Sequence, residues 1–455
     1  MTKKLFGTDG IRGKINHYPL TAEIALRLGQ AAAIILNKRL GKEHKKAGKK
    51  PKIIIGKDTR VSGYIFEYAL TSGLCSCGAD VYLVGPLPTP AVAHLVNSFG
   101  ADAGIMITAS HNPAGDNGIK FFDCKGFKLP DSEEHEIEAL VLGNNIDASK
   151  FSLIHSGKAY RVEDARGRYI EYCKSTILNQ DLGMFKIVVD CANGAAYKVA
   201  PRIFQELNAD VVVMGDEPDG FNINKGCGSL YPDLLEKEVL KQKADVGIAL
   251  DGDSDRIIMV DEKGEVVDGD EIIALSAIYM KEKGRLLDDT VVVTVMSNIG
   301  FHKSMDDNGI KVIKTKVGDR YVIEKMRSIG ARLGGEQSGH IIFSKYITTG
   351  DGIITALQVL RVMKHTGKKL SELKKCMTKY PQILLNIDVE EKKPLDQIRG
   401  YTDKLKSIEK KLGSEGRVLV RYSGTQNCCR VMVEGKDKKE IAGYADELIR
   451  IIKKA

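Results

Sequence analysis

ADVGIALDGDSDR, residues 244–256, carries the pattern from which the fold of this chain can be read. VGIAL is a continuous apolar run of the length of a buried strand. Three carboxylates follow it at alternate positions, Asp251, Asp253 and Asp255, and the segment ends at Arg256. Buried carboxylates repel one another unless a cation neutralises them, and such oxygen ligands suit Mg²⁺, which keeps room for water or a phosphate group. The segment therefore predicts a metal site at a strand end and favours phosphate chemistry.

The same order of strands and helical stretches occurs three times along the chain. Strands that alternate with helices indicate βαβ units and mostly parallel sheets. In each repeat the third strand leads into the most polar loop of the repeat, namely TASHNP (108–113), DGDSDR (251–256) and GEQSGH (335–340). Ligands of such sheets gather beyond the carboxyl ends of the strands. We therefore expect the three loops to face one shared site.

The C-terminal part of the chain has a different pattern. PQILLNIDVE (381–390), RVLVRYS (417–423) and CRVMVEG (429–435) read as strands, with helical stretches between and after them. Strands with helices on one face indicate an α+β domain. The expected fold is α/β, with three related βαβ-type domains of mixed, mostly parallel sheets and a C-terminal α+β domain around a central cleft. The expected domain limits are 1–155, 156–255, 256–368 and 369–455.

Composition excludes several classes of protein. A chain of 455 residues exceeds what one hydrophobic core serves, and no apolar run approaches the roughly 20 residues of a membrane span. The net charge of +8 comes without an aromatic and basic stripe, so small anionic substrates are expected rather than nucleic acid. The nine cysteines lack paired zinc spacing, and the start of the chain lacks the features of a signal peptide. A cytoplasmic protein with reduced thiols is expected.

The acidic loop partly matches a calcium-binding hand, because Glu262 occupies the twelfth position counted from Asp251. The sixth position of such a loop must be glycine, and here it is Arg256. The flanking segments also read as strands rather than helices. The calcium-hand interpretation therefore fails.

Ser110 in TASHNP lacks the G-x-S-x-G elbow of an acyl-transfer nucleophile. In an extended loop its neighbour His111 would point away from it. A serine can instead carry a phosphoryl group, which adds a charge of about −1.5 to −2. Close to the aspartates such a group requires Mg²⁺ between them, and the arrangement then makes a phosphoryl donor. An isolated serine two residues before Asn112-Pro113 would be interpreted as a turn residue, but the position of Ser110 at the strand end of the repeat favours its role as a phosphoryl donor.

Two further loops carry candidate binding residues. In GEQSGH the side chains of Glu336, Ser338 and His340 stand at alternate positions, so all three face one side if the segment is extended. They suit sugar hydroxyls or an amine. The C-terminal segment RYSGT with a later arginine suits an anion, against the alternative of a charged hairpin turn. Its candidate phosphate-binding residues are Arg421, Ser423, Gly424, Thr425 and Arg430.

Together these motifs resemble those of the α-D-phosphohexomutase family, from LFGTDGIRG (5–13) to the segment around RYSGT. In that family TASHNP is similar to the phosphoserine loop, DGDSDR to the metal loop, GEQSGH to the sugar-binding loop and RYSGT to the phosphate loop. The motifs GTDGIRG, DNGIKFF, DCANGAAY, VGDRYV and GEQSGH match the branch that acts on glucosamine phosphates. Gln337 supports this assignment, since relatives acting on mannose or glucose phosphates commonly have Met there.

The resemblance implies a mutase in which phosphorylated Ser110 donates to glucosamine 6-phosphate, giving a 1,6-bisphosphate and then glucosamine 1-phosphate for UDP-N-acetylglucosamine synthesis. It implies one Mg²⁺ per subunit, held by Ser110, Asp251, Asp253 and Asp255, with a bisphosphate such as glucosamine 1,6-bisphosphate as activator. A homodimer is compatible with it. Lys120 and His340 are the candidates for proton transfer, and Arg12 and Arg256 for charge stabilisation. The candidate sugar-binding residues are Glu336, Ser338, Gly318 and Asp319.

One motif departs from the family pattern. The phosphate loop of the family reads closer to R-P-S-G-T-E-P, whereas this chain has Tyr422, Gln426 and Asn427. The cationic and hydroxyl groups are kept, so phosphate binding is expected to persist. Two alternatives stay open: a mutase for mannose or glucose phosphates with the same mechanism, and a sugar-phosphate sensor without turnover.

Overall fold

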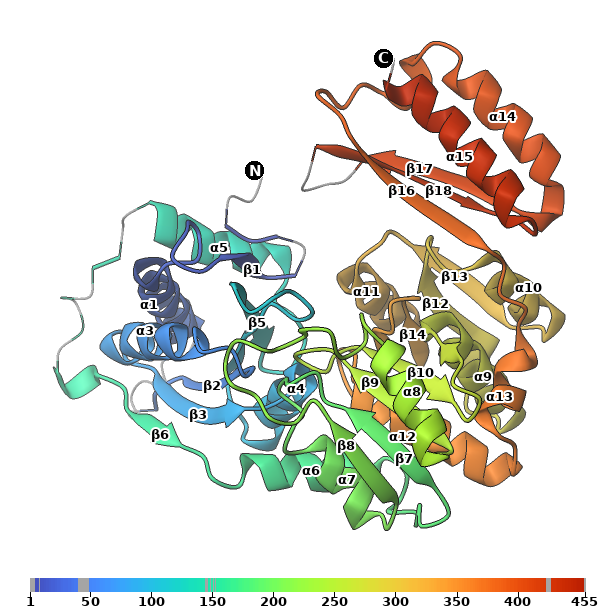
Figure 1. Cartoon of the computed structure of the whole chain (residues 1–455). Helices are drawn as coiled ribbons and strands as arrows, with labels where there is room; N and C mark the ends of the chain where they lie inside the picture. Colours follow the sequence, from blue (N-terminus) through green and yellow to red (C-terminus); the bar gives the residue numbers. More distant parts are fainter. Residues whose placement is uncertain are drawn as a thin grey trace. The chain divides into compact units, whose positions relative to one another are not determined.

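The computed structural model describes residues 5–7, 9–39, 49–143, 146–147, 149, 151, 153–422 and 427–453. The chain divides into two compact units (Figure 1). The larger unit consists of Met1–Val295 and Ile313–Lys374, and the smaller of Met296–Val312 and Lys375–Ala455.

The first sheet has the strand order β1-β5-β4-β2-β3-β6. Strand β2 pairs in parallel with β3 and β4, and β5 returns antiparallel to β4. The central strands are rich in isoleucine, and Ile53, Ile54 and Ile55 are completely buried. Apolar strands buried on both faces are typical of sheets that helices cover on each side. The strands are β1 (Ile11–Lys14), β2 (Lys52–Lys57), β3 (Asp80–Pro86), β4 (Ala103–Ile107), β5 (Asp116–Asp123) and β6 (Ala159–Arg161).

The second and third sheets repeat the core of the first. Their orders are β11-β10-β9-β7-β8 and β13-β12-β14-β15, so each contains the four-strand sequence seen in β5-β4-β2-β3. In each, the strand equivalent to β4 pairs in parallel with its inner neighbour and antiparallel with the strand that follows it. This topology confirms the three predicted repeats. The strands are β7 (Lys186–Asp190), β8 (Asp210–Met214), β9 (Val246–Leu250), β10 (Ile257–Asp261), β11 (Val266–Val267), β12 (Thr290–Thr294), β13 (Lys311–Thr315), β14 (Leu333–Gly335) and β15 (Ile341–Phe343).

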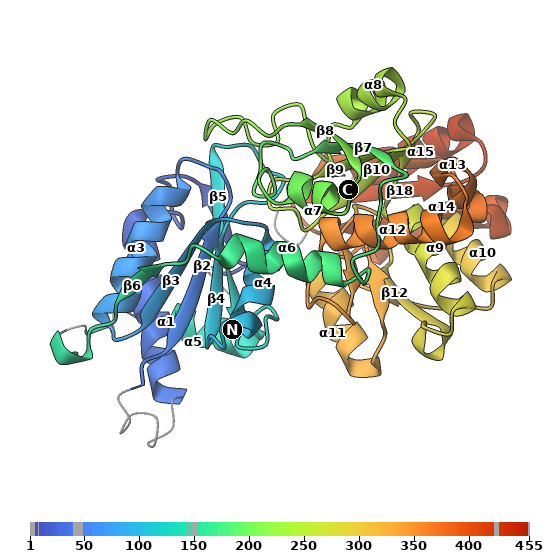
Figure 2. The same cartoon turned by 90° about the horizontal axis from the view of Figure 1, so that it is seen from below.

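Helices join and cover these strands, and their ends follow local sequence signals. Helix α9 begins with a capping box in which Asp268 and Glu271 satisfy each other's backbone N–H groups. Helix α12 begins at Asp351, whose side chain accepts from Ile354 N, and ends at Gly367 with a φ of 66°. Helices α6 and α12 lie side by side (Figure 2). The helices outside the C-terminal segment are α1 (Ala22–Arg39), α3 (Gly63–Ser76), α4 (Thr89–Ser98), α5 (Asp131–Leu142), α6 (Ala165–Ser175), α7 (Ala200–Glu206), α8 (Asp233–Gln242), α9 (Gly269–Glu282), α10 (Ile299–Asp307), α11 (Asp319–Ile329), α12 (Gly352–Thr366) and α13 (Leu370–Leu373).

The smaller unit contains the predicted α+β fold. Its three-stranded antiparallel sheet has the order β16-β18-β17. Helices α14 and α15 cover one face of this sheet (Figure 1), and a buried cluster that includes Val431, Ile441 and Leu448 fills the space between them. The elements are β16 (Gln382–Asp388), α14 (Tyr401–Leu412), β17 (Arg417–Tyr422), β18 (Cys428–Glu434) and α15 (Lys438–Lys453).

Two sheets extend past the domain limits expected from the sequence. Strand β6 joins the first sheet although it lies after residue 155, and β10 and β11 join the second sheet although they lie after residue 255. Strand β6 pairs in parallel with β3 at the edge of the first sheet, whereas β10 returns after the polar loop of the second repeat and pairs antiparallel with β9. No disulfide joins any of the nine cysteines, all of which lie among the described residues. Within the described part of the chain, no helix is long and apolar enough to cross a membrane.

Candidate active site

The polar loops of the three repeats follow β4, β9 and β14 directly, as the sequence predicts. The first two loops meet within the larger unit. Ser110 Oγ donates a hydrogen bond to Asp251 Oδ2 at 2.7 Å, and both residues are almost completely buried. The third loop adjoins the second, because Arg256 and His340 form an isolated antiparallel bridge.

Ser110 is held in a left-handed backbone conformation with a φ of 52°. Its N–H donates to Thr108 Oγ1 at 2.9 Å, and its carbonyl accepts from Arg60 Nη2 at 3.0 Å and from Asn224 Nδ2 at 2.9 Å. Residues without glycine's freedom keep such a conformation only where their surroundings impose it, and these residues cluster at functional sites. The surrounding contacts therefore fix the direction of the Ser110 hydroxyl.

The expectation that His111 points away from Ser110 is wrong. His111 Nδ1 lies 3.2 Å from Ser110 Oγ. An extended backbone would point the two side chains apart, but the left-handed conformation of Ser110 brings them together. Burial, followed by the charges of Arg256 and Arg12, lowers the pKa of His111 to about 4.

The three carboxylates of the acidic loop are buried and differ in their electrostatic environment. Burial and the neighbouring charges of Asp253 and Asp255 raise the pKa of Asp251 well above its usual value. Burial also acts to raise the pKa of Asp253, but Lys120 and the hydrogen bond from Thr89 outweigh it, so this pKa is lowered. Burial and its acidic neighbours therefore disfavour the charged form of Asp251, whereas Lys120 and Thr89 favour the charged form of Asp253.

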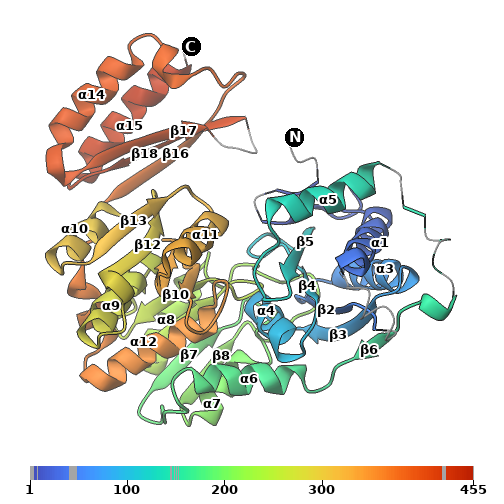
Figure 3. The same ribbon diagram turned by 180° about the vertical axis from the view of Figure 1, so that it is seen from behind.

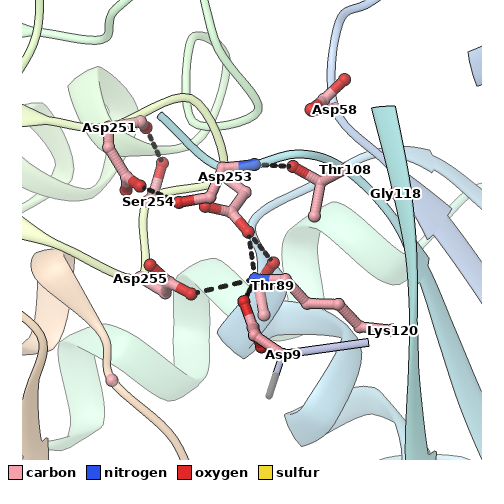
Figure 4. A network of polar contacts seen from close by, with 12 residues as sticks. Asp9, Asp58, Thr89, Thr108, Gly118, Lys120, Asp251, Asp253, Ser254 and Asp255 are labelled. Atoms are coloured by element: carbon pink, nitrogen blue, oxygen red, sulfur yellow. Dashed lines mark hydrogen bonds and ion pairs between the residues drawn. The ribbon is translucent and has the colours of Figure 1, made fainter. Parts of the chain in front are cut away.

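Lys120 on β5 is the principal protein cation among these carboxylates (Figure 4). Its Nζ lies 2.9 Å from Asp253 Oδ2 and 3.2 Å from Asp255 Oδ2, and its third carboxylate partner is Asp9 at 3.3 Å. Burial acts to lower the pKa of Lys120, but the three carboxylates outweigh it and raise this pKa well above the usual value. Lys120 is therefore a fixed positive charge in this arrangement.

The loop also fits a metal ion. Oxygen atoms of Asp251, Asp253 and Asp255 lie within 4.8 Å of one another. Of the carboxylate oxygens of Asp253 and Asp255, Lys120 contacts only the Oδ2 atoms. The Oδ1 atoms of both residues are buried with no hydrogen-bond partner among the described residues. Unpartnered buried carboxylate oxygens are costly, whereas a set of three suits a hard divalent cation. The three aspartates could hold such an ion without displacing Lys120.

The two predicted arginines lie close to the acidic loop. Arg12 on β1 forms an ion pair with Asp9, and the backbone N–H of Arg256 donates to Asp251 Oδ1 at 3.1 Å. Burial acts to lower the pKa of both guanidinium groups, but nearby carboxylates, first Asp9 for Arg12 and Asp255 for Arg256, raise it. Both groups therefore stay charged beside the site.

The interpretation of GEQSGH as an extended segment is wrong. Gly339 N donates to Glu336 O at 2.9 Å, and Gly339 has a φ of 89°, so residues 336–339 form a turn. Glu336 and His340 are buried, whereas Ser338 is exposed and does not share their side.

The turn nevertheless brings Glu336 and His340 close to the two other predicted residues of this region, Gly318 and Asp319. Gly318 N donates to Glu336 Oε1 at 3.0 Å. His340 Nε2 lies 3.3 Å from Asp319 Oδ2 and accepts from Gly350 N at 3.2 Å. Glu336, Gly318, Asp319 and His340 therefore form one buried or half-buried group next to Arg256.

The predicted phosphate loop belongs to the smaller unit. Arg421 on β17 and Arg430 on β18 are directly paired across the two strands. Burial and the charge of Arg430 lower the pKa of Arg421, as expected for two cations held on one face of a hairpin. Ser423, Gly424, Thr425 and Gln426 lie outside the described residues. Tyr422 and Asn427, which like Gln426 depart from the family pattern, lie directly before and after these four residues in the sequence.

Sequence reasoning missed several residues that complete the site. Asp9 and Lys128 form ion pairs with each other, and Lys128 also pairs with Asp319. Thr89 Oγ1 donates to Asp253 Oδ2 at 2.6 Å. Arg60, which is 1% exposed, lies three residues after the end of β2, where the rule that ligands gather beyond strand ends could have found it.

Comparison with known proteins matches every part of this architecture. Family models of phosphoglucomutase/phosphomannomutase match residues 3–146 (alpha/beta/alpha domain I), 167–264 (domain II), 268–380 (domain III) and 384–451 (C-terminal domain). Among solved structures, a phosphoglucomutase/phosphomannomutase family protein from Burkholderia thailandensis has a TM-score of 0.78 at 23% identity, covering 98% of this chain and 97% of that protein. N-acetylphosphoglucosamine mutase from Aspergillus fumigatus, in complex with GlcNAc-6P and magnesium, has a TM-score of 0.67 at 18% identity over 99% and 96%.

Curated relatives are similar over their full length. A phosphoglucosamine mutase from Syntrophotalea carbinolica is 53% identical over 455 residues, which is 100% of this chain and 98% of the relative. One from Pelobacter propionicus is 53% identical over 453 residues, covering 99% and 98%. Four matched domains in order, and relatives of this identity over the whole length, show that the chain belongs to the phosphoglucomutase/phosphomannomutase family of α-D-phosphohexomutases.

Proposed function

We propose that this chain interconverts glucosamine 6-phosphate and glucosamine 1-phosphate through a phosphorylated Ser110. The observation that carries the proposal is the 2.7 Å hydrogen bond from Ser110 Oγ to Asp251 inside a buried group of three aspartates. A nucleophilic oxygen beside a divalent-cation site is the arrangement that phosphoryl transfer requires. The choice of glucosamine rests on relatives 53% identical to this chain that are named phosphoglucosamine mutase.

The reaction balances as two phosphoryl transfers. In the first, the P–O bond to Ser110 Oγ breaks and a new P–O bond forms to O1 of glucosamine 6-phosphate, which loses its hydroxyl proton. Before the second, the 1,6-bisphosphate reorients in the site. The P–O bond to its O6 then breaks, the phosphoryl group returns to Ser110 Oγ, and O6 takes up a proton. The phosphoserine is regenerated and glucosamine 1-phosphate leaves.

Bound Mg²⁺ would neutralise the oxygens of the transferring group, and Ser110, Asp251, Asp253 and Asp255 are the residues that would hold one ion per subunit. The unpartnered Oδ1 atoms of Asp253 and Asp255 support this assignment. The contacts of Arg60 and Asn224 with the Ser110 carbonyl keep the serine in place while its hydroxyl is exchanged between free and phosphorylated forms.

Lys120 and His340 are the proposed groups for proton transfer. The raised pKa keeps Lys120 protonated and makes it a weak acid, so in this arrangement it suits a hydrogen bond to a sugar oxygen better than the removal of a proton. His340 Nε2 lies 3.3 Å from Asp319 Oδ2, so this carboxylate is placed to orient the imidazole. The charges of Arg12 and Arg256 would stabilise the transferring group.

Substrate binding is assigned to two groups of residues. Glu336, Gly318 and Asp319 would contact the sugar, together with Ser338, whose exposure in the turn leaves its hydroxyl accessible. Arg421 and Arg430, with Ser423, Gly424 and Thr425 of the same loop, would bind the phosphate group that is not transferred. Activation by glucosamine 1,6-bisphosphate and a homodimeric state belong to the same proposal.

A coupled assay for glucosamine 1-phosphate, with catalytic bisphosphate and Mg²⁺, tests the proposal. We expect Ser110→Ala to lose activity and the phosphate that mass spectrometry detects on the wild-type protein. Ser328→Ala, which removes an exposed hydroxyl on α11, is the matched control and should keep both. Full activity of Ser110→Ala would refute the mechanism. Higher turnover of glucose or mannose 6-phosphate than of glucosamine 6-phosphate would refute the assigned substrate.

A further inference from the structure

Residues of α9, of α12 and of the end of β15 line a small cavity within the larger unit. Helices α9 and α12 contact each other there and lie close together in the ribbon diagram (Figure 3). Its volume is about 50 Å³. A site for one water needs about 10–15 Å³ by this measure, so the cavity has room for roughly three to five waters or a group of phosphate size. Aromatic side chains, including Tyr279 and Tyr346, form part of its wall.

The cavity is strongly cationic. Its lining includes Arg285, Arg332, Lys345 and Arg361, and none of its lining residues is acidic. None of these four side chains forms an ion pair with a described carboxylate. Burial, followed by the charges of Arg361, Lys283 and Arg285, lowers the pKa of the adjacent His365, which agrees with a positive potential here.

Arg361 is the residue that requires an explanation. It is 5% exposed, and no described residue accepts a hydrogen bond from its guanidinium group. The buried hydroxyl of Ser276, which lines the same cavity, also has no partner among the described residues. Burying a cation without a counter-charge is unfavourable, so an arginine in this position calls for an anion from solution.

An alternative role is the neutralisation of helix C-termini, where cations are favourable. It does not account for Arg361, because the basic residues of the last turn of α12 are Lys364 and His365. The Arg361 guanidinium donates to no backbone carbonyl of the described residues either. The alternative therefore leaves the buried charge uncompensated.

We propose that this cavity is a second anion site, which binds the phosphate group of a small molecule through Arg361 and Ser276, with Arg285, Arg332 and Lys345 at its mouth. Guanidinium groups bind phosphate oxygens in a bidentate manner. The site is separate from the acidic loop. Gly352, at the start of α12, donates to Ser254 O at 3.0 Å, and Arg361 lies nine residues later, about 13 Å along the helix axis. Occupation of the cavity and of the active site is therefore not mutually exclusive.

The chain contains no tryptophan, so Tyr346→Trp provides a single fluorophore in the cavity wall. Inorganic phosphate is titrated into this full-length variant at constant ionic strength, with chloride as the reference anion. We expect a saturable change in tryptophan emission with a midpoint of about 1 mM or below, since phosphate would form several charge-assisted hydrogen bonds. A nucleoside monophosphate is titrated in parallel, and a lower midpoint would identify a nucleotide rather than free phosphate as the better ligand.

The same titration is repeated with a second substitution. Arg361→Met should raise the phosphate midpoint at least tenfold, and Arg285→Met, at an exposed position, at least threefold. Lys364→Met removes one positive charge from the same helix outside the cavity and should change the midpoint less than twofold. The absence of a saturable signal, or equal midpoints with and without Arg361 and Arg285, would overturn the proposal. Neither result depends on mutase activity.

Discussion

Replacing Lys120 by Met tests whether the acidic loop is balanced by one lysine and completed by a metal ion. The Nζ of Lys120 lies 2.9–3.3 Å from carboxylate oxygens of Asp253, Asp255 and Asp9, and the side chain is almost fully buried. Removing one partner of a buried ion pair costs about 3–5 kcal/mol, because the remaining charge is left uncompensated. Methionine has a similar length, so the change removes charge more than volume.

The loss can be measured as a change in the first unfolding transition by calorimetry. For a domain of about 150–250 residues, 1 kcal/mol corresponds to about 2–4 °C in Tm, so in EDTA the variant should unfold about 6–20 °C lower. Lys125→Met is the matched control: Lys125 lies just after the same strand, is exposed, and should change Tm little.

Magnesium should then stabilise the two proteins to different extents. Ligand binding stabilises a folded protein by about 2.7 kcal/mol at one hundred times its Kd. In Lys120→Met the carboxylates no longer face an ammonium group, so we expect Mg²⁺ to raise Tm more in this variant than in the wild type. An equal or smaller gain, or a Lys125→Met protein that behaves like Lys120→Met, would refute the assignment of Lys120 as the counter-charge of the metal loop.

Two further predictions concern other parts of the chain. Burial raises the pKa of Asp351 to about 6 in the folded protein. As pH rises, the unfolded chain therefore loses this proton before the folded protein does, and the free energy of unfolding falls between about pH 4 and 6. Asp351→Asn keeps a helix-capping oxygen and should show a flatter dependence of Tm on pH over this range; parallel curves would contradict it. Arg421→Gln should raise the KM for glucosamine 6-phosphate about ten- to hundredfold, whereas Arg399→Gln, an exposed change in the same unit, should leave KM unchanged. Equal KM values for the two variants would contradict phosphate binding by Arg421.

The sequence could predict the strand-end loops because their signal is local. An apolar run followed by Asp251, Asp253 and Asp255 can be recognised without knowing the fold, and the same placement in the first repeat identifies Ser110. The repeat then predicts that these loops share a site, since equivalent strands end at equivalent edges of their sheets. In the structure the 2.7 Å hydrogen bond from Ser110 to Asp251 joins the polar loops of the first and second repeats.

Other residues could not be recognised in this way, or were misread. Asp9, Thr89 and Lys128 have the local appearance of ordinary loop residues, and only the packing of distant segments brings them to the site. The error at Ser338 has a local cause. Alternation places side chains on one side only in an extended chain, whereas the glycine after Ser338 allows the turn that exposes it.

The charges of the site explain why a phosphoserine and a divalent cation belong together here. Lys120 is shared among Asp253, Asp255 and Asp9, and burial, followed by the charges of Asp253 and Asp255, raises the pKa of Asp251, so a further cation beside Asp251 would favour its charged form. A phosphoryl group on Ser110 would add a further charge of about −1.5 to −2 beside Asp251. A doubly charged cation on the free carboxylate oxygens would offset nearly all of this addition. The buried site would then keep almost the same net charge while the phosphoryl group moves between Ser110 and the sugar, which limits the electrostatic cost of each transfer.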